Sequence, residues 1–248
     1  MTTLRTPAPV KANASDDLPG ALRLWPLFLG FALLAALWLG PLPERSRGSF
    51  AAHMVVHMGI VAVAAPLLVL GLSRLWPAAL KGVPPKLALA ASFAEFALVW
   101  GWHAPALHNA ARVSAPLFLA EQASFLGAGL FVWMTALGAA SGPHRLAARA
   151  AGVAALLVTS MHMTLLGALL LFSPRPLYAC ADLCAPAAAM TPLQDQALGG
   201  VIMLLVGGAS YLAGGLALLS TVLRGPAGTE PSAAFAGVAS PSRPGAGA

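Results

Sequence analysis

Two pairs of histidines are the residues of this sequence best suited to metal chemistry. His53 and His57 are four residues apart, so on a helix both imidazoles lie on one face and could bind the same ion. His103 and His108 are five residues apart, which would place their rings on different faces of a straight helix. Pro105 lies between them and favours the start of a short helix that would re-aim His108. These four imidazoles define a candidate metal site.

Methionine and carboxylate side chains accompany the histidines. A methionine directly follows His53 and another follows His57, and a fifth histidine, His162, has a methionine on each side. Imidazole and carboxylate together suit first-row metals, and thioether sulfur adds a preference for Cu(I). The pattern therefore predicts a site for a first-row metal ion, with a preference for Cu(I) where thioether sulfur takes part. The candidate metal ligands are His53, His57, His103, His108 and His162, and the candidate supporting residues are Met54, Met58, Glu95, Glu121, Met161, Met163, Asp195 and Gln196.

The spacing indicates two places for a metal ion. His53 and His57 would form the core of the first, and a histidine of the second pair would complete it. His162 would form a second, deeper site with Met161 or Met163. Mixed imidazole and thioether ligands with incomplete coordination would bind such an ion exchangeably.

Carboxylates near these histidines could tune them. Glu121 and Asp195 are expected to accept hydrogen bonds from ligating imidazoles, which would fix the tautomer of each ring. Ordinary structural roles remain open for the same groups of residues. The histidines could be polar residues of a membrane interface, the methionines could be packing residues, and Glu95 and Glu121 could pair structurally.

The elements that position these residues must be membrane helices. Of 248 residues 58% are hydrophobic and only 9% charged, whereas a soluble domain carries roughly 25% charged residues. Crossing a membrane takes about 20 apolar residues, and lipid leaves no partner for unpaired backbone groups, so each crossing must be a helix. The sequence predicts an all-α polytopic transmembrane bundle of about six helices. The apolar runs are 22–40, 51–72, 87–102, 115–137, 147–172 and 197–223.

Lys and Arg predict the orientation of the bundle. If the N-terminus is cytoplasmic, ten of the 14 fall on the inner side, so the positive-inside rule places both termini in the cytoplasm. Residues 1–20 would then be a cytoplasmic tail, 21–224 the membrane domain and 225–248 a disordered cytoplasmic tail. The two histidine pairs, Asp195 and Gln196 would lie at the outer face, and His144 on the cytoplasmic side. The outer loop also carries Cys180 and Cys184, as a local disulfide or as free thiols. Because the basic residues lie between apolar runs rather than in one patch, no nucleic-acid partner is predicted.

Five segments resemble the CtaG-type family of multi-pass cytochrome c oxidase assembly factors, in the order in which that family carries them. They are AAHMVVHMGIVAVAAPLLVLG, WGWHAPALHNAA, AEQASFLGAGLFVW, MHMTLLGALLLFSPRPLY and TPLQDQALGG. The resemblance implies a protein of the bacterial inner (plasma) membrane that helps copper reach the catalytic subunit of a haem-copper oxidase. Its partners would be the lipid bilayer and either oxidase subunits or a periplasmic copper chaperone. Polar positions of the family are matched by His53, His57, His103, His108, Glu121, His162 and Asp195. One departure is Gln122, where related sequences often carry a histidine.

Two other classes of function compete with copper handling. A haem- or quinone-binding redox protein could use His57 and His162 as axial ligands of a haem. A copper or proton transporter could use Glu95 and His162 as a relay. Because the sequence contains neither H-E-x-x-H nor G-x-S-x-G, it does not predict an enzyme.

Overall fold

The structure is a computed structural model that describes residues 23–80, 83–138, 145–178 and 190–224. Within these residues every regular element is helical. The long helical stretches are α2 (Trp25–Leu39), α4 (Phe50–Met58) with η1 (Gly59–Ala64) and α5 (Ala65–Leu75), α6 (Pro85–Trp102), α8 (Ala115–Gly138), α9 (Arg145–Leu171), and α10 (Pro192–Ile202) with η3 (Met203–Gly208) and α11 (Ala209–Leu223). The short helices are α3 (Leu42–Gly48), η2 (Pro77–Leu80) and α7 (Pro105–Val113).

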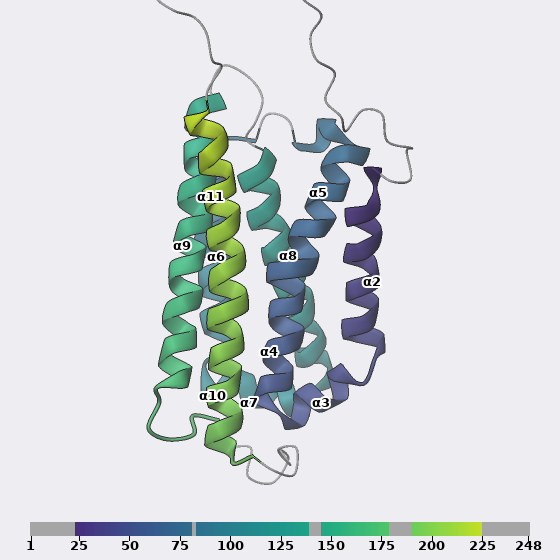
Figure 1. Cartoon of the computed structure of the whole chain (residues 1–248). Coiled ribbons are helices and arrows are strands. Elements are labelled where there is room, and N and C mark those ends of the chain that lie inside the picture. Colours follow the sequence, from purple (N-terminus) through teal and green to yellow (C-terminus); the bar gives the residue numbers. More distant parts are fainter. Residues whose placement is uncertain (1–22, 81–82, 139–144, 179–189, 225–248) are drawn as a thin grey trace, which may run out of the picture.

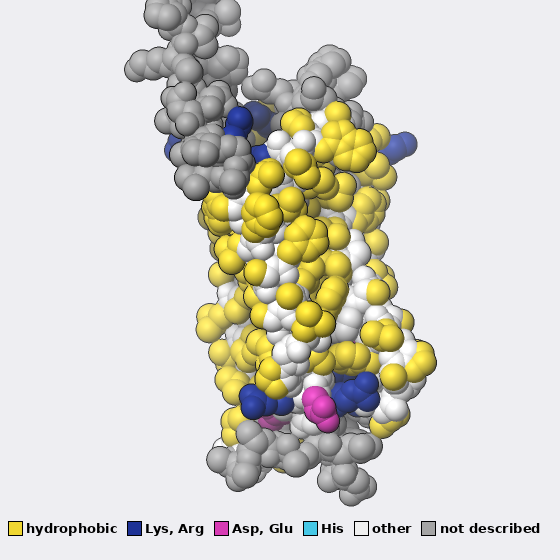
Figure 2. Space-filling view, turned by 90° about the vertical axis from the view of Figure 1, so that its right-hand side faces the viewer, with side chains coloured by type: hydrophobic (Ala, Val, Ile, Leu, Met, Phe, Trp, Pro, Cys, Tyr) yellow, Lys and Arg dark blue, Asp and Glu magenta, His cyan; other side chains and the backbone are white. Residues whose placement is uncertain are grey.

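The long helices have the length and composition of membrane spans. Four continuous helices qualify by themselves, at 50–75, 115–138, 146–171 and 192–223, and two bent pairs raise the number to six if each pair is one span. The pairs are α2 with α3, bent by 53°, and α6 with α7, bent by 71°. Figure 2 shows the flank of the bundle covered by hydrophobic side chains between two levels of Lys and Arg. The predicted all-α polytopic bundle of about six helices is confirmed, and each apolar run coincides with one long stretch.

One helix boundary differs from the sequence prediction. The last run was expected to begin at residue 197 and to leave Asp195 and Gln196 before the helix, but α10 begins at Pro192. Thr191 caps this helix by accepting from the backbone N–H of Gln194, whose side chain accepts from Thr191 N at 2.8 Å in return. Polar capping residues extend the helix beyond its apolar part. Both polar residues therefore lie in the first turns of α10, fixed by its hydrogen bonding.

The short helices α3 and α7 lie at one end of the bundle, the lower end in Figure 1. The first residues of α4, α8 and α10 lie at this end too, and we call it the α3/α7 end. The sequence predicts that it faces the outside, and this orientation stays a prediction. The predicted tails, His144, Cys180 and Cys184 lie outside the described residues.

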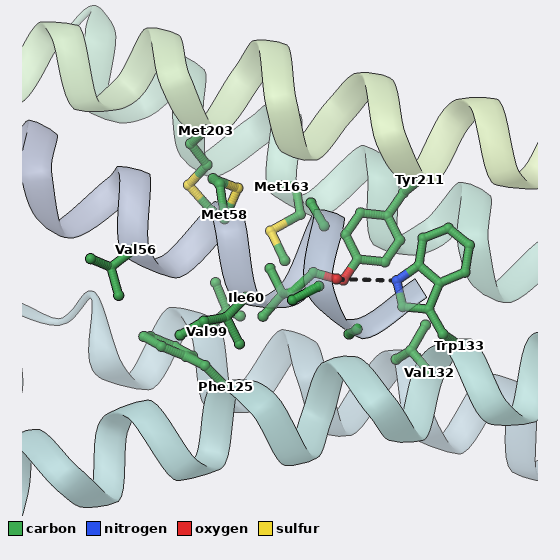
Figure 3. Close-up of a cluster of buried hydrophobic side chains, with 14 of the residues drawn as sticks. Val56, Met58, Ile60, Val99, Phe125, Val132, Trp133, Met163, Met203 and Tyr211 are labelled. Atoms are coloured by element: carbon green, nitrogen blue, oxygen red, sulfur yellow. Dashed lines mark hydrogen bonds between the residues drawn. The ribbon is translucent and has the colours of Figure 1, made fainter. Parts of the chain in front are cut away.

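The second stretch runs through the middle of the bundle and changes its helical winding there. Pro66 has no N–H to donate to the carbonyl of Ala62 four residues earlier, and the segment before it is a π-helix with a bond from Ala65 N to Ile60 O. Neighbouring helices supply donors to this segment. Ser210 Oγ donates to Ala62 O at 2.6 Å, and Trp133 Nε1 donates to Val61 O at 3.1 Å. Trp133 belongs to the buried hydrophobic cluster drawn in Figure 3.

Candidate metal centre

The two histidine pairs meet at the α3/α7 end. His53 and His57 come from α4, His103 follows the last residue of α6, and His108 lies in α7. The ring centroids of His53 and His108 are 4.9 Å apart, those of His57 and His103 5.3 Å, and those of His53 and His103 5.6 Å. We call these four residues the histidine cluster. All four are buried, with at most 5% of the residue exposed.

The bend between α6 and α7 brings the second pair to the first. The predicted helix start at Pro105 is confirmed, and α7 leaves α6 at 71°. His108 therefore turns back toward His53, although a straight helix would point His103 and His108 apart. His103 Nδ1 lies 2.6 Å from the carbonyl of Val99, which makes this nitrogen the protonated donor and leaves a lone pair on Nε2.

Asp195 positions the helix that carries the first pair. Its carboxylate accepts from the backbone N–H groups of Phe50 at 2.6 Å and Ala51 at 3.3 Å, and from Ser49 Oγ at 2.7 Å. These donors belong to the start of α4, where unpaired N–H groups and the helix dipole attract an anion. The prediction that Asp195 orients an imidazole directly is therefore wrong. It anchors the first turn of α4, and His53 stands at the end of that turn.

Gln196 and Tyr178 close the cluster on the side of α9 and α10. Gln196 Oε1 accepts from Leu177 N at 2.7 Å, and its Nε2 donates to Leu170 O at 3.2 Å, so it holds the chain that leaves α9. Tyr178 OH donates to the carbonyl of His103 at 3.0 Å, and its ring stacks on Phe50 at 4.6 Å. Burial raises the pKa of the Tyr178 phenol above its ordinary value. Gln196 thus supports the cluster through Tyr178, a contact that the sequence alone did not indicate.

The imidazoles carry buried nitrogens that lack hydrogen-bond partners among the described residues. They are His53 Nε2, both nitrogens of His57, His103 Nε2 and His108 Nδ1. A buried polar atom without a partner costs about 1–3 kcal/mol, so such atoms are rare in folded proteins. A neutral ring offers one lone pair to a metal ion, and the lone pair of His53 Nδ1 already faces Arg112 Nη1, so His57, His103 and His108 carry the free lone pairs that a metal ion would satisfy. The residues present therefore fit a copper ion, for which imidazole is a suitable ligand.

A buried ion pair lies beside the cluster. Arg112 Nη2 pairs with Glu121 Oε2, and Arg112 Nη1 donates to the carbonyl of Ser46 at 2.9 Å. The same Nη1 lies 3.3 Å from His53 Nδ1. Glu121 Oε2 is 3.9 Å from that nitrogen, so the predicted hydrogen bond between Glu121 and an imidazole is replaced by contacts through Arg112. One ligand atom each of His53, His108 and Glu121 still lie within 4.8 Å of one another.

Sequence reasoning missed Arg112 and treated it only as a topology marker. Its position held a usable signal, because Arg112 follows His108 by four residues and therefore shares a face of α7 with it. Spacing alone could not show that the Arg112–Glu121 ion pair lies beside the cluster, because Glu121 reaches it from a different helix.

His162 lies apart from the cluster, on α9. It is 3% exposed, both of its ring nitrogens lack partners among the described residues, and its ring centroid is 5.4 Å from that of Phe96. Of the two methionines beside it, Met161 is 65% exposed and points away from the interior, whereas Met163 is buried. Only Met163 can share a buried site with His162.

The buried methionines gather in the core. Figure 3 shows Met58, Met163 and Met203 pointing toward one another from three different stretches of helix. Gly207 makes room for two of them, because a Cβ there would lie 2.9 Å from Met58 Sδ and 3.5 Å from Met163 Cβ. Met203 was not among the sequence candidates. A fourth methionine buried among the described residues, Met54, packs at Gly199 instead, where an added Cβ would lie 3.1 Å from its Cγ.

Glu95 lies deeper in the bundle and pairs with a tyrosine. Its Oε1 accepts from Tyr211 OH at 2.6 Å, and that hydroxyl also bonds with the indole of Trp133 (Figure 3). Glu95 Oε2 has no partner among the described residues. Glu95 therefore contributes to the core and makes no contact with the histidine cluster that would support a ligand there.

One family of known proteins matches the chain. The family model for the cytochrome c oxidase caa3 assembly factor, Caa3_CtaG, covers residues 8–225 and thus every described helix. No curated protein and no solved structure matches the chain significantly.

Proposed function

This chain belongs to the family of cytochrome c oxidase caa3 assembly factors, and we propose that it binds copper at the histidine cluster and aids its delivery to the oxidase. Copper is the cargo in this proposal. The role in oxidase assembly rests on family membership. The choice of copper as the ion rests on the imidazole nitrogens of the cluster.

The observation that carries the proposal is the set of unpartnered imidazole nitrogens. Such atoms are costly in a buried site unless a ligand satisfies them. His57, His103 and His108 would hold the ion, His53 would join them once its Nδ1 is released from Arg112, and neutral imidazoles bind Cu(I) without adding charge. With more donors than one ion requires, the ligands can exchange one at a time, which suits an ion that has to leave again.

Release would take place at the α3/α7 end. His103 is the most exposed of the four histidines at 5%, so a partner would reach the ion from its side. If this end faces outward as predicted, the partner is an oxidase subunit or a periplasmic copper chaperone. A second, deeper position would use His162 with Met163, and the thioethers of Met58 and Met203 favour Cu(I) there as well.

A binding measurement with matched variants tests the proposal. The purified protein is loaded with Cu(I) in detergent, and the copper retained is compared with that of the double variant His53→Ala/His57→Ala. We expect the double variant to lose at least one copper per chain, and His144→Ala, predicted to lie at the opposite face, to keep the wild-type amount. Equal copper in the wild type and the double variant would overturn the site, and a Soret band in the purified protein would favour a haem-binding role instead.

A further inference from the structure

Arg112 places a fixed positive charge inside the donor set of the proposed copper site. Its guanidinium is almost fully buried, with 3% of the side chain exposed, and it contacts Glu121, His53 Nδ1 and the carbonyl of Ser46. A cation beside metal ligands disfavours a second cation unless a negative charge compensates for it. Glu121 provides that charge, so the histidines, Arg112 and Glu121 together carry no net charge.

The ion pair also occupies one of the two carboxylate oxygens of Glu121, Oε2. His53, His108 and Glu121 have ligand atoms within 4.8 Å of one another, and two imidazoles with one carboxylate are a ligand set typical of divalent zinc or iron. Arg112 occupies Glu121 Oε2, and its Nη1 lies against His53 Nδ1. A divalent ion that used Glu121 Oε2 and His53 Nδ1 would have to displace the guanidinium from a buried position, whereas Glu121 Oε1 has no hydrogen-bond partner among the described residues. The remaining donors are neutral imidazoles, which a monovalent ion can use without moving Arg112.

We propose that Arg112 is the specificity-determining residue of this site, because it holds the site at zero net charge and thereby favours Cu(I) over divalent ions. This inference rests on the proposed function. The electrostatic energy of an ion in a fixed potential is proportional to the charge of the ion. A change in potential that alters Cu(I) affinity by some factor therefore alters the affinity of a divalent ion by about the square of that factor.

A purely structural ion pair would give a different result. If Arg112 and Glu121 only hold α7 against α8, their removal would weaken the binding of every ion through loss of the fold, and the ratio of affinities would not move. The ratio of Zn(II) to Cu(I) affinity is therefore the quantity to measure, rather than either affinity alone.

The experiment compares this ratio among charge variants of the full chain in detergent. Cu(I) and Zn(II) are each titrated in competition with a chromogenic chelator. Arg112→Gln leaves Glu121 uncompensated, and we expect Cu(I) affinity to rise about tenfold and Zn(II) affinity about a hundredfold. Glu121→Gln should shift the ratio in the opposite direction. The double variant Arg112→Gln/Glu121→Gln is again neutral, so its ratio should return to within about threefold of the wild-type ratio.

Control variants distinguish a failure of this inference from a failure of the proposed function. Arg175→Gln removes an exposed arginine from the loop after α9 and should leave the ratio unchanged. Arg112→Lys keeps the charge and should keep the preference for Cu(I). If the wild type binds Cu(I) but both single variants keep the wild-type ratio of Zn(II) to Cu(I) affinity, Arg112 does not set the selectivity. If the wild type binds no Cu(I), the proposed function and this inference fail together.

Discussion

The hydrogen-bonding state of each imidazole nitrogen, more than the residue types, distinguishes this cluster from an ordinary polar interface. His103 donates its Nδ1 proton to Val99 O, which leaves the lone pair of Nε2 available to a metal ion. In His53 the lone pair of Nδ1 faces Arg112 Nη1, so the proton of that neutral ring is on Nε2. Residue types and spacing identified all four histidines in advance. They could not show that Asp195 bonds to backbone N–H groups, because that depends on where α10 meets α4.

Asp195 gives a prediction at the residue scale. Asp195→Ala removes a carboxylate that accepts three hydrogen bonds at the start of α4, and we expect it to lower the free energy of unfolding by about 2 kcal/mol. Copper affinity should fall too, because His53 and His57 lie on the helix that this carboxylate anchors. Thermal unfolding followed by circular dichroism measures the first effect. Glu44→Ala, an exposed acid of α3, should change stability by less than about 0.5 kcal/mol. Equal stability of the Asp195 variant and the wild type would show that Asp195 does not anchor α4.

The helices were largely predictable, but their bends were not. Runs of apolar residues indicated six long stretches and their approximate ends, because the length needed to cross lipid is a property of the local sequence. Pro105 likewise predicted the start of α7. The 71° angle that turns His108 toward His53 depends on packing against α3 and α8, and no local pattern encodes it. The π-helical segment before Pro66 similarly depends on donors from distant helices.

Ser210 gives a prediction at the element scale. Ser210→Ala removes the hydroxyl that donates to the carbonyl of Ala62, and we expect it to cost about 1 kcal/mol. In a Pro66→Ala background the cost should be smaller, because residue 66 then has an N–H that can donate to that carbonyl. Unfolding of the two single variants and the double variant gives the coupling between the positions. Ser220→Ala on the same helix, whose hydroxyl bonds within its own turn, serves as the control. Strictly additive effects would show that Ser210 does not compensate for Pro66.

At the scale of the whole molecule, the polar chemistry is unevenly distributed along the bundle. The histidine cluster, the Arg112–Glu121 pair and Asp195 all lie toward the α3/α7 end, while Glu95, Met163 and Met203 lie deeper. This arrangement suits a site that is served from one face of the membrane. Family membership agrees with a role in the assembly of the oxidase. The distribution of Lys and Arg predicts that the α3/α7 end lies at the outer face of the membrane.

The most direct test of the copper site is X-ray absorption at the copper edge of the Cu(I)-loaded protein. Imidazole nitrogens should dominate the first coordination shell of the wild type, with scattering from the ring carbons beyond it. In His53→Ala/His57→Ala this contribution should fall, with the remaining copper showing mainly sulfur from the deeper methionines. An unchanged imidazole signal in the double variant, or a wild-type spectrum without imidazole ligands, would contradict copper binding at the histidine cluster.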